Sequence, residues 1–159
     1  MYIKGITIIS GGQTGVDRAA LDSALAKEIP CRGWCQKGRL AEDGIIDLKY
    51  PLQETESEDP AVRTEKNVID SDGTLIIHAG NLDQGTAVTI RSCIIHNKPM
   101  HEVDLTVLYN TEHVIKWIRD HKIEKLNVSG PRESNAEGIY EAAAEFMNRL
   151  LKLYTGQGR

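Results

Sequence analysis

The sequence has few cysteines, no long apolar run and no excess of positive charge, and each lack excludes a class of protein. Three cysteines are an odd number and too few for the disulfide framework of a small secreted domain. No apolar segment approaches the roughly 20 residues that span a bilayer. A formal net charge of -4, without a basic stripe, argues against a general nucleic-acid-binding protein. We therefore expect a cytoplasmic protein without a signal peptide, a membrane contact or a nucleic-acid partner.

Length and composition are those of an ordinary globular protein, and we expect a single domain over residues 1–159. A chain of this size buries about 70% of the surface that its unfolded form exposes, which is enough for a sizeable core. No internal repeat, linker or low-complexity segment divides the sequence.

Short apolar strands alternate with helices along the chain, and this alternation predicts the fold class. The expected strands are 5–9, 31–35, 50–55, 73–78, 99–103 and 125–129, and the expected helices are 19–26, 60–69, 86–96, 111–121 and 135–154. Residues 36–49 are expected to form a long, charged, glycine-rich surface loop. The pattern predicts an α/β protein with a three-layer Rossmann-like fold, in which helices cover both faces of a mostly parallel sheet.

The segment Ser10–Arg18 places three glycines at the turn from the first expected strand into the first helix. Glycine there allows positive φ angles and lets a ligand approach the backbone. Free N–H groups at the helix start favour an anion, and we expect a larger residue at Gly12 to fill the ligand's space. A tight turn that binds nothing is the alternative, although such a turn needs fewer glycines. The candidate ligand-binding residues are Gly11, Gly12, Gln13, Thr14, Gly15, Asp17 and Arg18.

Two later loops follow strands in the same way, at residues 81–86 and 130–134. The carboxyl ends of parallel strands meet at one edge of a sheet, so we expect all three loops to line a single ligand site there. The candidate residues in these two loops are Gly85, Thr86, Arg132, Glu133 and Ser134. Lys37 and Arg39 are the other cations that we expect near the site.

Some of these residues have a second explanation. Arg132 is the favoured phosphate ligand because Gly130 and Pro131 fix its loop, and a guanidinium makes bidentate phosphate contacts. Asp17 either interacts with the helix dipole or orients a ligand hydroxyl or ring nitrogen, and the sequence does not decide between these roles. Ser134 is alternatively the N-cap of the last helix.

Several familiar motifs are absent from the candidate loops. No Lys-Ser or Lys-Thr follows the last glycine of the first loop, so it is not a Walker loop. The Gly-Gly-x-x-Gly spacing, without an acid after the second strand, disfavours a dinucleotide site. Cys31 and Cys35 on one strand would lie about 13 Å apart, at about 3.3 Å per residue, which is too far for one zinc ion. The five histidines lack metal-ligand spacing, and only His78 ends a strand at the predicted edge. We predict no metal ligand and no catalytic residue.

Six segments together resemble a known family, and they span nearly the whole chain: Ser10–Asp17, Gly33–Arg39, Ala41–Gly44, Arg63–Val68, Asp70–Thr74 and Gly130–Ser134. They are similar to the molybdenum cofactor carrier proteins, which share a Rossmann-like superfamily with lysine-decarboxylase-like and YpsA-like proteins. The resemblance implies molybdenum cofactor (molybdopterin) as a small phosphorylated ligand, and a homo-oligomer, with a tetramer as the expected form. The helix over 86–96 is apolar on more than one side, so we expect part of the surface near Ile90, Ile94 or Ile95 to be buried between subunits.

The enzyme branch of the same superfamily releases a base from a nucleoside monophosphate. Its motif is Gly-Gly-x-Gly-Thr, followed by a catalytic Glu. The matching stretch here is Asp83–Thr89, and Thr89 stands where that Glu would be. A hydroxyl cannot replace a carboxylate in stabilising positive charge or activating water. Binding is therefore favoured over hydrolysis. There are two alternatives to a binding protein. One is an enzyme whose catalytic carboxylate comes from Glu133 or Asp17, and the other is a nucleotide-sensing module.

Overall fold

The main sheet of the protein has six strands, all parallel, in the order β5-β2-β1-β8-β6-β7. A computed structural model describes residues 5–156. Its strands in this sheet are β1 (Thr7–Ile9), β2 (Cys31–Cys35), β5 (Leu52–Glu54), β6 (Gly73–His78), β7 (Met100–Asp104) and β8 (Lys125–Ser129). The strands predicted from the sequence are all present, with ends that differ by a few residues.

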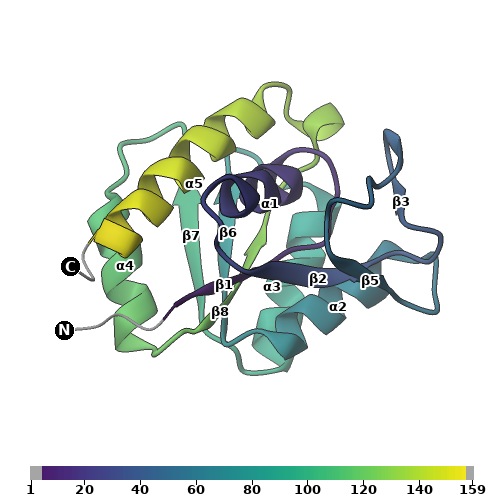
Figure 1. Cartoon of the computed structure of the whole chain (residues 1–159), viewed down its shortest axis with the longest axis horizontal. Coiled ribbons are helices and arrows are strands. Elements are labelled where there is room, and N and C mark those ends of the chain that lie inside the picture. The colour runs from purple at the N-terminus through teal and green to yellow at the C-terminus, as the bar shows by residue number, and fades with distance from the viewer. Residues whose placement is uncertain (1–4, 157–159) are drawn as a thin grey trace.

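Helices cover both faces of this sheet (Figure 1). They are α1 (Val16–Ala26), α2 (Pro60–Asp70), α3 (Gln84–Ile95), α4 (Thr111–Asp120) and α5 (Ile139–Gly156). Helix α5 packs against α1 and α4 on one face, and α2 packs against α3 on the other. The predicted three-layer Rossmann-like fold is therefore confirmed. None of the helices in the described part of the chain is long and apolar enough to cross a membrane.

The largest hydrophobic core lies between the sheet and the layer of α1, α4 and α5. Its centre is formed by side chains such as Leu75, Ile77, Leu126 and Phe146, all fully buried. Strand β6 is buried along its whole length, as a central strand with helices on both faces should be. A smaller cluster, which contains Leu21, Cys35, Ile46, Tyr50 and Leu52, joins α1 to β2 and β5.

The strand order reverses its direction at β1, which pairs with β2 on one side and with β8 on the other. The loops that follow β1 and β8 therefore leave neighbouring strands at the same edge of the sheet. The loop after β6 joins them there, because β6 is the other neighbour of β8. In open parallel sheets this reversal point opens a crevice that ligands use.

Two predicted boundaries are wrong. Residues 36–49 are not a plain loop, because they contain an antiparallel hairpin of β3 (Leu40–Ala41) and β4 (Gly44–Ile45). The last helix begins at Ile139 and not at 135, and a short 3₁₀ turn, η1 (Glu133–Asn135), precedes it. The Glu133 carboxylate accepts hydrogen bonds from the N–H groups of Gly138 (2.6 Å) and Tyr140 (2.9 Å), which closes the turn and delays the helix.

Candidate functional site

The three loops that were predicted to converge contact one another at the carboxyl edge of the sheet. The first and third loops meet where the Val16 N–H donates to the Pro131 carbonyl (3.3 Å) and the Glu133 N–H donates to the Thr14 hydroxyl (3.2 Å). Asp83 joins the second loop to the third, since its Oδ2 accepts from the Asn135 side-chain amide at 3.1 Å. The loops thus form one continuous rim.

Gly15 allows the first loop to approach the backbone of the third loop closely. A Cβ atom at this position would lie 2.4 Å from the carbonyl oxygen of Pro131, and its φ is +81°. Any other residue would both clash with that backbone and adopt a strained left-handed conformation. The glycine therefore lets α1 start directly against the loop after β8.

A narrow polar crevice lies between the loops, with a volume of about 30 Å³. Its side chains come from α1, α2, α3 and β8, and they include Asp17, Arg63, Thr89 and Ser129. A larger cavity of about 530 Å³ is lined by Asn81, Leu82, Asp83, Gln84, Gly85, Pro131, Arg132 and Asn135. The crevice and this cavity share three lining residues: Asp83, Gly85 and Arg132. The larger cavity has the size of a small-molecule site.

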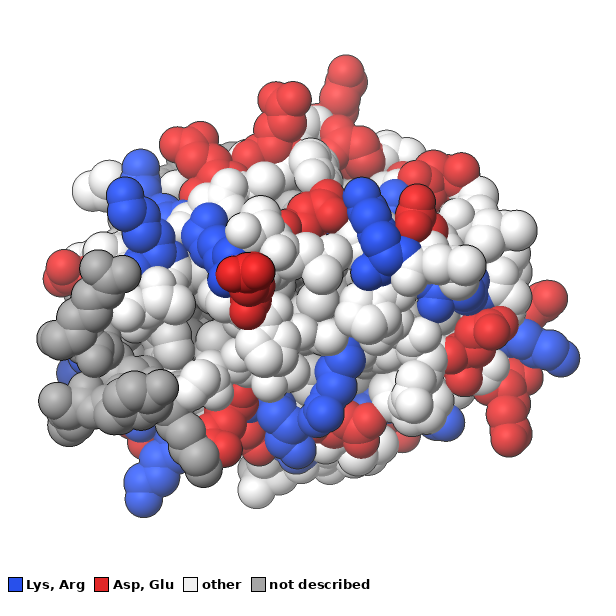
Figure 2. All heavy atoms as spheres, in the orientation of Figure 1, with Lys and Arg blue, Asp and Glu red and all other residues white. Residues whose placement is uncertain are grey.

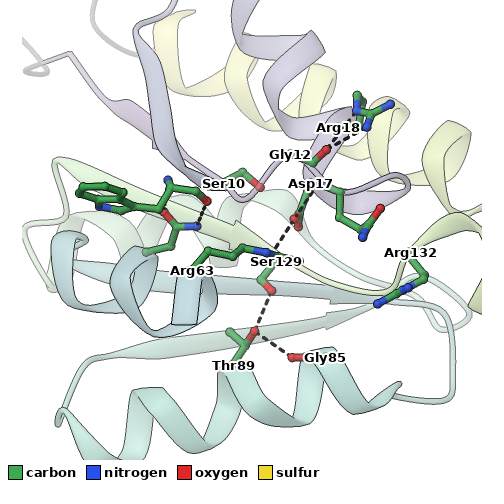
Figure 3. A network of polar contacts seen from close by, with 12 residues as sticks. Ser10, Gly12, Asp17, Arg18, Arg63, Gly85, Thr89, Ser129 and Arg132 are labelled. Atoms are coloured by element: carbon green, nitrogen blue, oxygen red, sulfur yellow. Dashed lines mark hydrogen bonds and ion pairs between the residues drawn. The ribbon is translucent and has the colours of Figure 1, made fainter. Parts of the chain in front are cut away.

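Asp17 and Arg63 form a buried pair in the crevice (Figure 3). Asp17 Oδ2 lies 3.5 Å from Arg63 Nη1 and accepts a hydrogen bond of 3.3 Å from the Gln13 N–H. Burial raises the pKa of the Asp17 carboxyl, and the charge of Arg63 and the Gln13 hydrogen bond lower it only in part. Arg63, 12% exposed, has no other hydrogen-bond partner within residues 5–156, so most of its donors are free for a ligand.

Arg63 was not among the predicted site residues. It lies on α2, 46 residues from Asp17 in the sequence, and no loop motif points to it. The sequence did carry one signal for Arg63, because this residue begins Arg63–Val68, a segment that resembles the family. Arg132 lies across the crevice from Arg63, with its guanidinium turned toward the same space (Figure 3).

The adjacent glycines of the first loop make room for different neighbours. A Cβ at Gly11 would lie 2.3 Å from Arg63 Nη1, so this glycine makes space for the guanidinium. A Cβ at Gly12 would instead lie 2.5 Å from Leu52 Cδ1 and 3.1 Å from Ile46 Cδ1. The expectation that a side chain at Gly12 would fill the ligand's space is therefore wrong, because this position faces the smaller apolar cluster.

The helix position that carries a carboxylate in the related enzymes holds a hydroxyl here. Thr89 Oγ1 donates to the Gly85 carbonyl (3.2 Å) and lies 2.9 Å from Ser129 Oγ, as the dashed lines in Figure 3 show. Thr86 is buried, and its N–H and hydroxyl both donate to Asp83 Oδ1. Asp83 thus caps α3 through Thr86, whereas Gly85 and Thr89 line the crevice.

The tip of the β3–β4 hairpin lies against the first and third loops. Glu42 accepts hydrogen bonds from the hydroxyls of Thr14 and Ser134 and from the Ser134 N–H, and lies 3.9 Å from Arg132 Nη1. Partial burial raises the pKa of Glu42, but these hydrogen bonds and the Arg132 charge outweigh it, so its pKa lies below the ordinary value. Glu42 was missed by the site prediction, although it lies in the resemblance segment Ala41–Gly44.

The neighbouring acid of the tip is paired as well. Asp43 receives two hydrogen bonds from the Arg18 guanidinium, at 2.7 and 3.1 Å, and these lower the pKa of its carboxyl. Arg18 also donates to the Gly12 carbonyl. Arg18 and Arg132, two of the predicted ligand-binding residues, thus both have a carboxylate of the hairpin beside them.

The other predicted residues lie outside the two cavities. Lys37 is exposed, at the base of the hairpin. The Glu133 carboxylate is held by the start of α5, as described above. His78 is buried, with Nε2 2.5 Å from Glu102 and with Nδ1 unpartnered within the described residues. Arg39 fixes the base of the hairpin by donating to the carbonyls of Ile46, Asp47, Tyr50 and Leu52.

Comparison with known proteins identifies the family. The model of the circularly permutated YpsA SLOG family matches residues 8–151. The chain belongs to this family. It is similar to the crystal structure of a putative molybdenum carrier protein from Syntrophus aciditrophicus SB, with 44% identity and a TM-score of 0.88. That match covers 92% of this chain and 95% of the other. A search of curated proteins gave no match. The resemblance inferred from the motifs is therefore confirmed.

This YpsA-family chain has a further cavity, of about 370 Å³, on the α2 side of β2 and β5. Arg32, Trp34 and Gln53 line it, and none of the predicted site residues does. In the part of the chain that the structure describes, no group of three or more His, Cys, Asp or Glu side chains is placed to hold a metal ion. At the carboxyl edge, by contrast, three loops bring the Asp17–Arg63 pair and Arg132 to one crevice, and this crevice is the candidate ligand site.

Proposed function

We propose that this chain is a carrier that binds molybdenum cofactor, or a related phosphorylated pterin or nucleotide, at the carboxyl edge of its sheet. The observation that carries the proposal is the pair of guanidinium groups, Arg63 and Arg132, that line one crevice beside a cavity of ligand size. Guanidinium groups suit the bidentate recognition of phosphate. The name of the similar protein from Syntrophus aciditrophicus supports the carrier role.

The donor set fits a phosphorylated heterocycle. Arg63 and Arg132 would hold the phosphate, with hydroxyls such as that of Ser129 as additional donors. Asp83 lines both cavities, and its carboxylate fixes the loops around the ligand by accepting from the N–H and hydroxyl of Thr86 and from the Asn135 side chain. Molybdenum would arrive within the cofactor and supply its redox chemistry there, while the protein would hold the organic part.

The geometry favours binding over base release. Thr89 places a hydroxyl at the helix position where the related enzymes carry a carboxylate. The observation in favour of an enzyme is Asp17, a carboxyl of raised pKa that lines the same crevice. Asp17 Oδ2 is already engaged, however, by the Gln13 N–H (3.3 Å) and by Arg63 (3.5 Å).

The test is to denature the purified protein and to identify the released small molecule by mass spectrometry. We expect a phosphorylated pterin or nucleotide from the wild type, and several-fold less of it from Arg132→Gln. Arg149→Gln is the matched control, because Arg149 is an exposed cation on α5 that pairs with Glu145. A released molecule without phosphate, or equal amounts from both variants, would contradict the proposal.

A further inference from the structure

The Glu42 carboxylate is surrounded by hydrogen-bond donors and a positive charge, the groups that bind anions. Around it lie the hydroxyl groups of Thr14 and Ser134, the Ser134 N–H at 3.2 Å and the Arg132 guanidinium at 3.9 Å. Each of these groups donates hydrogen bonds or carries positive charge, as the surroundings of a bound phosphate do. Arg132 also lines both cavities, so this place adjoins the proposed ligand site.

The hairpin tip is held to the rest of the protein by polar contacts. Besides the Glu42 contacts, the Asp43–Arg18 pair (2.7 Å) and a hydrogen bond from the Glu42 N–H to the Gln13 side chain (2.9 Å) bind it. The apolar side chains that follow the tip face solvent, with Ile45 78% and Leu48 84% exposed, and of those before it Leu40 is 39% exposed while Ala41 touches the smaller apolar cluster. Movement of the tip away from the rim therefore exposes little apolar surface that is now buried.

The base of the hairpin is fixed in a different way. Ile46 is 1% exposed within the smaller apolar cluster, and Arg39 donates to four backbone carbonyls there. Buried apolar contacts and hydrogen bonds to charged donors are costly to break. The tip can therefore leave its place while the base stays folded.

We propose that Thr14 and Ser134, together with Arg132, extend the Arg63–Arg132 phosphate site into an anion subsite, and that Glu42 is the displaceable occupant of this subsite. The inference rests on the proposed function, which supplies a ligand with a phosphate. A phosphate dianion offers more charge and more acceptor oxygens to the same donors than a carboxylate does, so it wins the competition. Binding then releases the hairpin tip from the rim.

The experiment is a calorimetric titration with inorganic pyrophosphate of the wild type, Glu42→Gln and Asp47→Asn. Both variants remove one negative charge from residues 36–49, but within residues 5–156 the Asp47 side chain accepts a hydrogen bond only from the Lys49 N–H. We expect Glu42→Gln to bind pyrophosphate about tenfold more tightly than the wild type, since a competing charged acceptor is lost. We expect Asp47→Asn to bind like the wild type.

Hydrogen exchange of the wild type provides a second measurement that does not depend on a variant. With saturating pyrophosphate, the amides of residues 40–45 should exchange faster, because the tip is displaced. Slower exchange there, unchanged or weaker binding by Glu42→Gln, or no pyrophosphate binding by either protein would overturn the subsite. The proposed function fails separately, if the purified protein releases no phosphorylated molecule, and the pyrophosphate result stands regardless of that outcome.

Discussion

Gly11 and Gly12 are adjacent, yet the space that each leaves open belongs to a different part of the protein. The space beside Gly11 is filled by the Arg63 guanidinium, and the space beside Gly12 by Leu52 and Ile46. One glycine therefore serves the candidate site and the other the apolar packing beneath it. A pattern of glycines in a sequence indicates a tight turn but not which side of the turn the ligand uses.

Replacing Gly12 by valine should destabilise the fold. The φ of +80° disfavours any β-branched residue, and the new methyl groups would overlap Leu52. We expect a loss of roughly 2–4 kcal/mol in the free energy of unfolding, measured by urea denaturation. Gly5→Ala is the control, since nothing lies within 4 Å of a Cβ there. Unchanged stability together with lost ligand binding would show that Gly12 faces the ligand after all.

The wild type should release no appreciable base from AMP, GMP or CMP. Loss of a positioned carboxylate typically lowers the rate about a hundredfold to ten-thousandfold, and Thr89 offers only a hydroxyl. Chromatography of each nucleotide after long incubation, beside Thr89→Glu, measures this. Clear base release that Asp17→Asn abolishes would instead establish a relocated catalytic acid.

The residues of the site were only partly predictable from the sequence. The loops after β1, β6 and β8 were found because each follows an apolar strand, and such loops share one edge in a parallel sheet. Arg63 and Glu42 were not found, because α2 and the hairpin reach the site only through tertiary packing. Ile46 and Arg39, which set the position of the hairpin, act through buried contacts that no local pattern reveals.

At the scale of elements, the β3–β4 hairpin differs most from its prediction. Its strands have two residues each, too short for an alternating pattern to show, and its glycines and charges are typical of a loop. The elements of the main sheet were predictable, because their apolar runs are longer and bounded by turns. Helix α5 started later than expected because the Glu133 carboxylate binds the backbone before it.

Acid should release the hairpin tip before it unfolds the sheet. The pKa values of Glu42 and Asp43 lie below their ordinary values, because of hydrogen bonds from Ser134 and Thr14 and the Arg132 charge in one case and because of Arg18 in the other. The stability that they contribute is complete above the unfolded-state pKa values, near 4, and is lost as pH falls through the lower folded-state values.

The measurement is an NMR titration of backbone amides. We expect the signals of residues 40–45 to change below about pH 4 while those of β6 stay constant. In Glu42→Gln the same signals should already be shifted at neutral pH. If the signals of residues 40–45 and of β6 changed together in one transition, the tip would have no opening equilibrium of its own.

At the scale of the whole molecule, the surface in Figure 2 shows basic and acidic side chains interspersed over the described part of this face. The exposed surface also carries apolar residues on α3, where Ile94 and Ile95 are 66% and 68% exposed. We propose that these isoleucines contact a second copy of the chain, as expected for a homo-oligomer. Adjacent exposed isoleucines are costly in water, and a contact between copies would bury them.

Light scattering at micromolar concentration should give a multiple of the chain mass of 17.6 kDa. The double variant Ile94→Glu, Ile95→Glu should lower that mass, because four buried charges would face one another across a symmetric contact. Leu108→Glu is the control, as Leu108 is fully exposed in the loop between β7 and α4. A wild type that measures 17.6 kDa would remove the proposal.

Strand β8 follows every other strand of the main sheet in the chain, yet it lies between β1 and β6. The earlier strands form two groups, β5-β2-β1 and β6-β7, which share no ladder until β8 pairs with both. Arg132 and the backbone that meets Thr14 follow directly after it. During synthesis the candidate site is therefore incomplete until β8 and the loop after it have been made and have joined the two groups of strands.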